Sequence, residues 1–411
     1  MPTARSEAGR TQRDLRERAT DVCRYSDVLN IKTPTHPAFR AGKRTVIDTR
    51  SSGRPGAAPP YPQGARPDPA TPSASSREGG NPQLAIRTFP QPNCPLCATP
   101  GRPQYTGMRD RLYSAPGTWT LARCSNERCG LMWLDPMPLT EDLHIAYQQY
   151  FTHADASETR AEPRLPWLVR TPLRAVRKVL MALGRIGRDV RMLNYFGLEN
   201  DPPGRILELG AGDGGRVKRL RAKGWQVDAQ DVDPHAQVFK LEGEGVRIHR
   251  GPLESLDLPP QAFDAIGMNH VLEHLPDPVG TLRRCATLLK PGGKLVAITP
   301  NTDSLCARVY GFAWMALEPP RHLHLFNTRN LADLARRAGY ASVTVQPTGA
   351  NGAGVALGSR HISTTGRFNL TDLSRSTGES ALISAIHVIE GVFPSLGEEC
   401  VLVARTPGSA A

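Results

Sequence analysis

Strands and helices alternate from residue 205 onward, and this alternation constrains the fold more than any other feature of the sequence. The apolar run Arg205–Leu209 enters a glycine loop and then a helical segment, Arg216–Lys223. Antiparallel strands can be joined by short hairpins, whereas parallel strands need crossover connections of about this length, usually helices. The sequence therefore predicts an α/β domain, with a doubly wound Rossmann-like sheet and helices on both of its faces.

Further strands and helices are expected in the same order along the chain. Each predicted strand is a short apolar run, and the predicted helices fill several of the gaps between them. We expect strands at 227–230, 246–249, 263–268, 294–299, 342–346 and 400–404, and helices at 234–242 and 278–289.

The glycine loop after the first strand predicts a ligand site at that strand's carboxyl end. Gly210, Gly212 and Gly215 satisfy a dinucleotide fingerprint, and Asp231 lies near the distance expected for a ribose-binding acid. The loop alone therefore fits a dehydrogenase as well as a methyltransferase that binds S-adenosylmethionine. Glu208 favours the second, because a carboxylate at the strand end would repel a pyrophosphate and attract the methionine amino group.

Two motifs downstream extend this pattern. The fourth expected strand leads into N-H-V-L-E-H-L at 269–275, and L-L-K-P-G-G at 288–293 turns into the fifth. With the glycine loop, this set resembles the class I S-adenosylmethionine-dependent methyltransferases, in particular the subgroup with L-E-H-L and L-K-P-G-G motifs. The resemblance covers about 205–348 and the final strand. It implies a seven-stranded, mostly parallel sheet whose last strand is antiparallel.

The resemblance also implies a role for each residue around the cofactor. S-adenosylmethionine would lie across the carboxyl ends of the first strands, and Asp231 would take both ribose hydroxyls, since a carboxylate has the two acceptors a diol requires. The family often places an acid where this chain has Pro252. The other implied cofactor residues are Gly210, Gly212 and Gly214 at the methionine moiety, Leu253 and Glu254 at the adenine, and Asn269 near the methyl group.

The acceptor side needs alignment and, for a hydroxyl or acidic C–H acceptor, a base. Four histidines follow the fourth and fifth strands: His270, His274, His322 and His324. We expect His322 and His270 to be the candidates for the base, although any one histidine can be purely structural. The acceptor expected from the resemblance is a small molecule, a sugar or a lipid-linked sugar, methylated on oxygen or carbon rather than nitrogen.

Four cysteines precede this domain in a pattern that suits a metal. Cys94 and Cys97 form a C-x2-C pair, and Cys124 and Cys129 form a C-x4-C pair. Four thiolates make a closed, structural zinc site. The segment resembles the zinc ribbon found ahead of some of these methyltransferases, and we expect the zinc to fold this module without entering the chemistry. The alternative is a set of free buried thiols.

The chain thus divides into four parts. We expect a disordered tail at 1–92, rich in Arg, Pro, Ser and Gly; a zinc-ribbon-like module at 93–152; a basic amphipathic helical linker at 153–200; and the methyltransferase domain at 201–407, with a cap over the acceptor at about 349–397. The basic face of 165–198 also allows peripheral contact with an anionic membrane.

Charge and composition leave two alternatives open. The net charge of +12 and the zinc module allow an RNA or DNA methyltransferase or a nucleic-acid-binding protein, although no Lys/Arg run is interleaved with aromatics. A catalytically inactive methyltransferase fold is the other alternative. No apolar run approaches the roughly 20 residues of a membrane span, and the first thirty residues lack the apolar stretch of a signal peptide, so we expect a cytoplasmic protein.

Overall fold

The computed structural model describes residues 85–148, 186–368, 385–386, 389–390 and 393–408. Most of the expected tail (1–92), residues 153–185 of the expected linker and residues 369–384 of the expected cap lie outside the described residues. So does most of the segment 165–198, for which membrane contact is expected. Among the described helices, none is long and apolar enough to cross a membrane.

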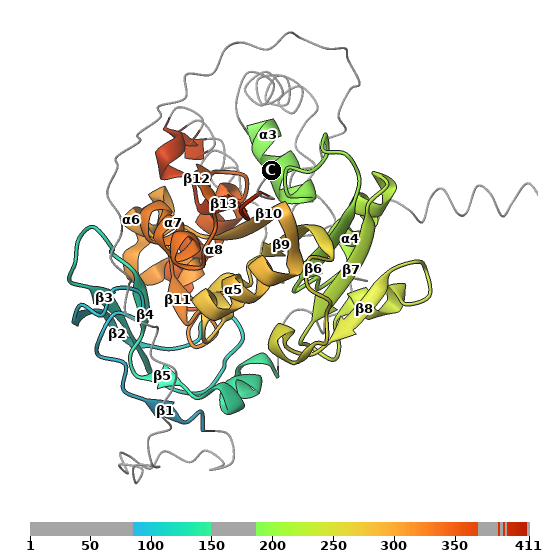
Figure 1. The fold of residues 1–411 in the computed structure, drawn as a ribbon. Helices are drawn as coiled ribbons and strands as arrows, with labels where there is room; N and C mark the ends of the chain where they lie inside the picture. The colour runs from blue at the N-terminus through green and yellow to red at the C-terminus, as the bar shows by residue number, and fades with distance from the viewer. Residues whose placement is uncertain (1–84, 149–185, 369–384, 387–388, 391–392, 409–411) are drawn as a thin grey trace, which may run out of the picture.

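A seven-stranded sheet forms the centre of the described structure (Figure 1). Its strand order is β12-β13-β10-β9-β6-β7-β8, and β13 runs antiparallel to both of its neighbours while the other pairs are parallel. The expected mostly parallel sheet with an antiparallel last strand is therefore confirmed. The strands are β6 (Arg205–Leu209), β7 (Gln226–Asp231), β8 (Arg247–Arg250), β9 (Phe263–Asn269), β10 (Leu289–Pro300), β12 (Ser342–Thr348) and β13 (Glu399–Arg405).

Both faces of this sheet are buried, as a doubly wound fold requires. Alternate residues of one strand point to opposite faces, and in β10 Leu295 and Ala297 join one apolar cluster while Val296 and Ile298 join another. The first cluster includes residues of α5 and α7, and the second includes residues of α3 and α4. The helices are α3 (Ile186–Tyr195), α4 (Gly215–Ala222), α5 (Pro278–Leu288), α6 (Leu305–Tyr310), α7 (Thr328–Arg337) and α8 (Gly352–Thr365).

The helix expected at 234–242 is wrong, because the structure has only a short 3-10 turn there, Gln237–Leu241. Asp233 accepts a hydrogen bond from the backbone of His235, a local turn that competes with helix formation. Val238 N donates to the carbonyl of Gly212 at 2.8 Å. The N–H of Val238 therefore binds the glycine loop and is not available for a hydrogen bond within an α-helix at 234–242.

The cysteine segment, residues 93–148, forms a second sheet that includes one strand from the methyltransferase region. Its order is β11-β4-β3-β2, and β11 (His324–Leu325) pairs with β4 through the registers His324 to Trp133 and Leu325 to Met132. Figure 1 shows this sheet beside the orange elements of the C-terminal half. The other strands are β1 (Thr88–Phe89), β2 (Gly101–Met108), β3 (Trp119–Cys124), β4 (Met132–Leu134) and β5 (Met137–Pro138), of which β1 and β5 pair as a separate two-stranded sheet. The 3-10 helix Thr140–Tyr147 follows β5.

A buried ion pair reinforces this junction. Arg321 is fully buried, and its Nη1 and Nη2 donate to the two carboxylate oxygens of Asp110 at 2.8 and 2.9 Å. Its Nε donates to Glu318 at 2.8 Å, and Nη1 also donates to the carbonyl of Ala146. The cysteine segment and the loop before β11 therefore share one apolar core and one ion pair.

We predict that Arg321→Ala destabilises the protein by about 3–5 kcal/mol, because it leaves the carboxylate of Asp110 buried without its partner. Arg336→Ala is the matched control, since Arg336 pairs with Asp333 at an exposed site and such pairs contribute about 0–1 kcal/mol. The free energy of unfolding, measured by urea titration, checks both variants. Equal free energies of unfolding for the two variants would show that the pair of Arg321 and Asp110 contributes no more to stability than an exposed pair.

Candidate functional site

The glycine loop at the carboxyl end of β6 is tightly packed on one side. Gly210 has φ +62°, and a Cβ there would lie 2.4 Å from Cγ2 of Val271. Its backbone N–H donates to Oε1 of Gln230, which also binds the carbonyl of Gly251 through Nε2. Only glycine fits this close approach in a left-handed conformation, so the sequence holds the loop against the segment after β9.

The same loop is open at Gly212. This residue has φ +52°, but a Cβ placed on it would meet nothing within 4 Å. Its N–H donates at 2.7 Å to Oδ2 of Asp231, the last residue of β7. Burial raises the pKa of Asp231, whose side chain also accepts from the N–H of Asp233. The predicted cofactor residues Gly212 and Asp231 are thus brought together at one sheet edge, beside open space.

Glu208 is buried on β6 and already has a cationic partner. Nη1 of Arg216 donates to its Oε1 at 2.7 Å, whereas Oε2 has no partner among the described residues. Burial raises the pKa of Glu208, and the charge of Arg216 opposes that shift. Glu208 is therefore not the free carboxylate expected from the sequence, because Arg216 balances much of its charge and only Oε2 lacks a partner among the described residues.

The other predicted cofactor residues lie along the same part of the sheet. Asn269 ends β9 and is half-buried, and Leu253 is buried in a 3-10 turn after β8. Glu254 accepts a hydrogen bond from Thr281 Oγ1 at 2.7 Å, which ties this turn to α5. Gly214 has φ +71° and caps α4. A Cβ on Gly214 would approach Leu241 to 2.9 Å, so this glycine also serves packing.

His270 is held between two carboxylates. Its Nδ1 lies 3.0 Å from Oε1 of Glu273, and its Nε2 lies 2.7 Å from Oε1 of Glu399 on β13. Burial opposes the charged ring, but the hydrogen bonds to Glu273 and Glu399 outweigh it and raise the pKa of His270 to about 10. Both ring nitrogens are donors here, so this histidine has no free lone pair with which to take a proton.

His322 is buried and oriented differently. Its Nδ1 lies 2.7 Å from the carbonyl of Ala316 and must donate to it, since a carbonyl oxygen only accepts. Nε2 faces Oε2 of Glu318 at 3.7 Å and Oε1 of Glu273 at 4.0 Å. The ring of His274 packs against it with centroids 4.7 Å apart. Of the two candidate bases, His322 is the one with a ring nitrogen, Nε2, that makes no hydrogen bond among the described residues.

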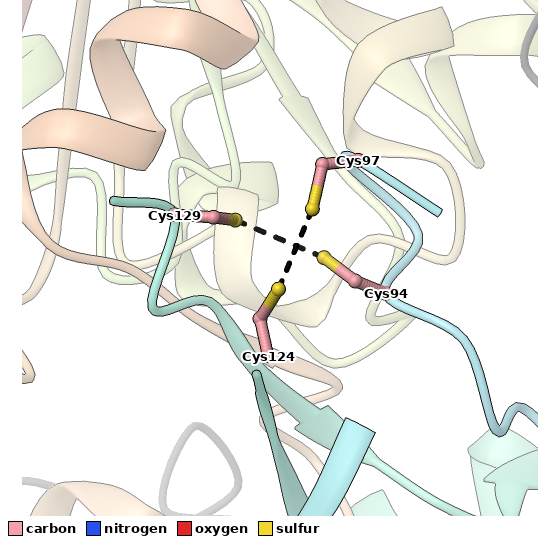
Figure 2. A group of neighbouring side chains, drawn as sticks. All are labelled: Cys94, Cys97, Cys124 and Cys129. Atoms are coloured by element: carbon pink, nitrogen blue, oxygen red, sulfur yellow. Dashed lines mark hydrogen bonds between the residues drawn. The ribbon is translucent and has the colours of Figure 1, made fainter. Parts of the chain in front are cut away.

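The four cysteines of the predicted zinc site converge (Figure 2). The sulfurs of Cys94 and Cys129 are 3.8 Å apart, and those of Cys97 and Cys124 are 3.4 Å apart. A hydrogen bond from Cys94 lowers the pKa of Cys129 to about 6. Four sulfurs bound at about 2.3 Å around a tetrahedral zinc are about 3.8 Å from one another, so both the donor set and the spacing fit zinc.

Several residues at this site were not among the sequence candidates. Gln230 and Arg216 hold the glycine loop and Glu208, and the first could have been suspected because it precedes Asp231. Tyr147, Glu318 and Glu399 contact the histidines from other parts of the chain. They share no motif or spacing with their partners, so the sequence gives no signal for them.

The part of the chain that contains the glycine loop matches a known protein family. Residues 184–345 match a family model described as a methyltransferase domain. The ubiquinone biosynthesis O-methyltransferase of Xanthomonas axonopodis pv. citri (strain 306) is 34% identical over 142 residues, which are 32% of this chain and 59% of that protein. The same enzyme from Xanthomonas oryzae pv. oryzae (strain PXO99A) is 35% identical over 141 residues, with the same coverage. The chain therefore carries a methyltransferase domain and spans about 59% of these curated relatives.

Solved structures resemble it more distantly. Phosphoethanolamine N-methyltransferase 2 of Haemonchus contortus with S-adenosyl-L-methionine is 16% identical, with a TM-score of 0.37 over 54% of this chain and 52% of that one. A possible histamine N-methyltransferase of Thermotoga maritima is 20% identical, with a TM-score of 0.36 over 58% of this chain and 97% of that one.

Proposed function

We propose that this protein transfers a methyl group from S-adenosylmethionine to a small-molecule, sugar or lipid-linked acceptor, on oxygen or carbon. One observation carries the proposal: Gly212 and Asp231 meet beside open space at the carboxyl edge of β6 and β7, within a methyltransferase domain. A carboxylate there suits the vicinal hydroxyls of a ribose, and glycine permits close approach of the cofactor.

The other cofactor roles follow from position along this edge. The loop of Gly210, Gly212 and Gly214 would contact the methionine moiety, and Oε2 of Glu208 remains available to its amino group. Leu253 and Glu254 would border the adenine, with Glu254 tied to Thr281. Asn269 would face the methyl group from the end of β9.

An oxygen on a small molecule is the acceptor atom that the relatives favour. The matching curated proteins are named O-methyltransferases of ubiquinone biosynthesis, and the match spans 59% of their length. Their name supports O-methylation of a small molecule here, ahead of N-methylation. No described surface gives comparable support to a nucleic-acid substrate.

His322 is the residue that we assign to the acceptor, which it would orient or help to deprotonate. Its free Nε2 lies in the loop before β11, next to Glu273 and His274. We no longer assign His270 as a base, because both of its nitrogens donate hydrogen bonds, to Glu273 and Glu399. We assign it a positioning role instead.

The cysteine segment is assigned a structural zinc held by Cys94, Cys97, Cys124 and Cys129, in the zinc-ribbon-like module at 93–152. Its sheet includes β11, and the carbonyl of Cys129 accepts from the side chains of Asn327 and Asn330. The metal would therefore support the loop that presents His322, which differs from the expectation that it serves its own module alone.

We predict that Asp231→Ala weakens S-adenosylmethionine binding by about 2–3 kcal/mol, roughly thirty-fold to over a hundred-fold, because the ribose loses a charge-assisted pair of hydrogen bonds. Asp333→Ala, at an exposed site on α7, is the control and should bind normally. Isothermal calorimetry gives both affinities. Normal binding by Asp231→Ala would remove the ribose assignment, and no binding by the unaltered protein would favour an inactive fold.

We predict one zinc per chain, lost when Cys97→Ser and Cys129→Ser are combined. Elemental analysis of the purified proteins measures it. The double variant should keep its affinity for S-adenosylmethionine within about twofold, because the cofactor residues belong to other strands, while methyl transfer falls with the loosening of the His322 loop. A zinc content unaffected by the two substitutions would place the metal elsewhere.

We predict that His322→Ala binds S-adenosylmethionine normally and transfers methyl groups about a hundred-fold to ten-thousand-fold more slowly, the usual loss when acid–base assistance is removed. The assay follows labelled methyl groups from the cofactor into an acceptor found by screening cell extracts. His144→Ala, at an exposed histidine, is the control. Full turnover by His322→Ala at saturating acceptor would give His322 a structural role.

A further inference from the structure

Three side chains at the carboxyl edge of the sheet converge on one point. Glu273, His274 and His322 each offer a ligand atom, and these atoms lie within 4.8 Å of one another. Glu273 and His274 follow β9 in a short 3-10 turn, next to Val271, which packs on Gly210 of the glycine loop. The cluster is therefore close to the loop assigned to the cofactor and on the side assigned to the acceptor.

Both histidines bind a carbonyl oxygen through Nδ1, which leaves Nε2 as the nitrogen that can bind a metal ion. Nδ1 of His322 donates to the carbonyl of Ala316 at 2.7 Å. Nδ1 of His274 lies 3.0 Å from the carbonyl of Arg321 and 3.1 Å from the hydroxyl of Tyr147. A ring whose Nδ1 donates to a carbonyl presents Nε2 with its lone pair, which is the usual orientation of a metal-binding histidine.

Glu273 is the anionic member of the cluster. Its side chain is fully buried, and its Oε2 has no partner among the described residues. The nearby guanidinium of Arg321 is already shared by Asp110 and Glu318. Oε1 of Glu273 is held by the charged ring of His270, which also binds Glu399, so it is Oε2 that is buried without a partner in the described part of the chain, an unfavourable state that a bound cation would relieve.

The distances around Nε2 of His322 also leave room for a cation. This nitrogen faces carboxylate oxygens of Glu318 and Glu273 at 3.7 and 4.0 Å, too far for a hydrogen bond. Both carboxylates would attract a positive charge placed between these atoms. Ligands at about 2.0–2.2 Å from one metal ion are about 3.0–3.5 Å apart, so the ligand atoms of Glu273, His274 and His322, which lie within 4.8 Å of one another, would move together by at most about 1.5 Å to bind one ion.

We propose that Glu273, His274 and His322 bind a divalent cation. Two imidazoles and a carboxylate suit zinc, manganese or iron, and three protein ligands leave coordination positions open for an oxygen of the acceptor. The inference rests on the proposed function and specifies it: His322 acts on the acceptor through a bound cation, and the acceptor is an oxygen compound. This site is separate from the four cysteines, which form a closed centre.

Titration with Mn²⁺ tests the site, because manganese prefers oxygen and nitrogen ligands and competes poorly for thiolates. Free Mn²⁺ is measured by electron paramagnetic resonance in solutions of the full chain. We expect one Mn²⁺ per chain in protein that already holds one zinc, so that the four cysteines are occupied. Glu273→Gln, His274→Ala and His322→Ala should each weaken binding at least about tenfold, while His144→Ala, at an exposed histidine, should leave it unchanged.

S-adenosylmethionine calorimetry on the same samples separates this inference from the proposed function. Cofactor binding without Mn²⁺ binding by the unaltered chain overturns the cation site and leaves the methyltransferase assignment standing. Absence of cofactor binding by the unaltered chain overturns that assignment instead. Full Mn²⁺ affinity in His274→Ala and His322→Ala that still bind cofactor would also overturn the cation site.

Discussion

The ion pair between Arg321 and Asp110 is the interaction on which the side assigned to the acceptor depends. Both side chains are fully buried and lie 211 residues apart in the chain. Removing two charges from water is so unfavourable that the pair persists only where both partners and their other hydrogen bonds are in place. Correct packing of the cysteine segment is therefore a condition for the position of Arg321, and His322 is the next residue.

Contacts continue from this pair across the whole acceptor side. Arg321 binds Glu318, which faces His322, and Glu273 connects His322 to His270. Beyond it, Glu399 on β13 accepts from His270 and from Asn351 before α8. Substituting one member would leave its neighbours with buried, unmatched charge, so we expect their effects on stability to be non-additive.

The cofactor side is held together differently, and this explains what the sequence could predict. Buried parallel strands are apolar runs, so β6 was predicted to the residue, and Gly212 lies only 19 residues from Asp231 within one strand-helix-strand unit. Cysteine spacing likewise predicted that four sulfurs meet. Three other contacts join segments that are distant in the sequence, and no local pattern predicts them. They are the pairing of β11 with β4, the ion pair of Arg321 with Asp110, and the hydrogen bond between His270 and Glu399.

The cysteine segment and the methyltransferase domain share a sheet and hydrogen bonds, so a metal bound by the four cysteines would also support part of the methyltransferase domain. The carbonyl of Cys129 accepts hydrogen bonds from Asn327 and Asn330, and these two residues also form the capping box that starts α7. Because β11 lies between His322 and this cap, the segment from Arg321 to Asn330 is fixed at both ends by the cysteine segment. Loss of order around Cys129 would thus reach His322 through hydrogen bonds and one strand pair, while the Gly212 and Asp231 contact, which lies within the central sheet, would be unaffected.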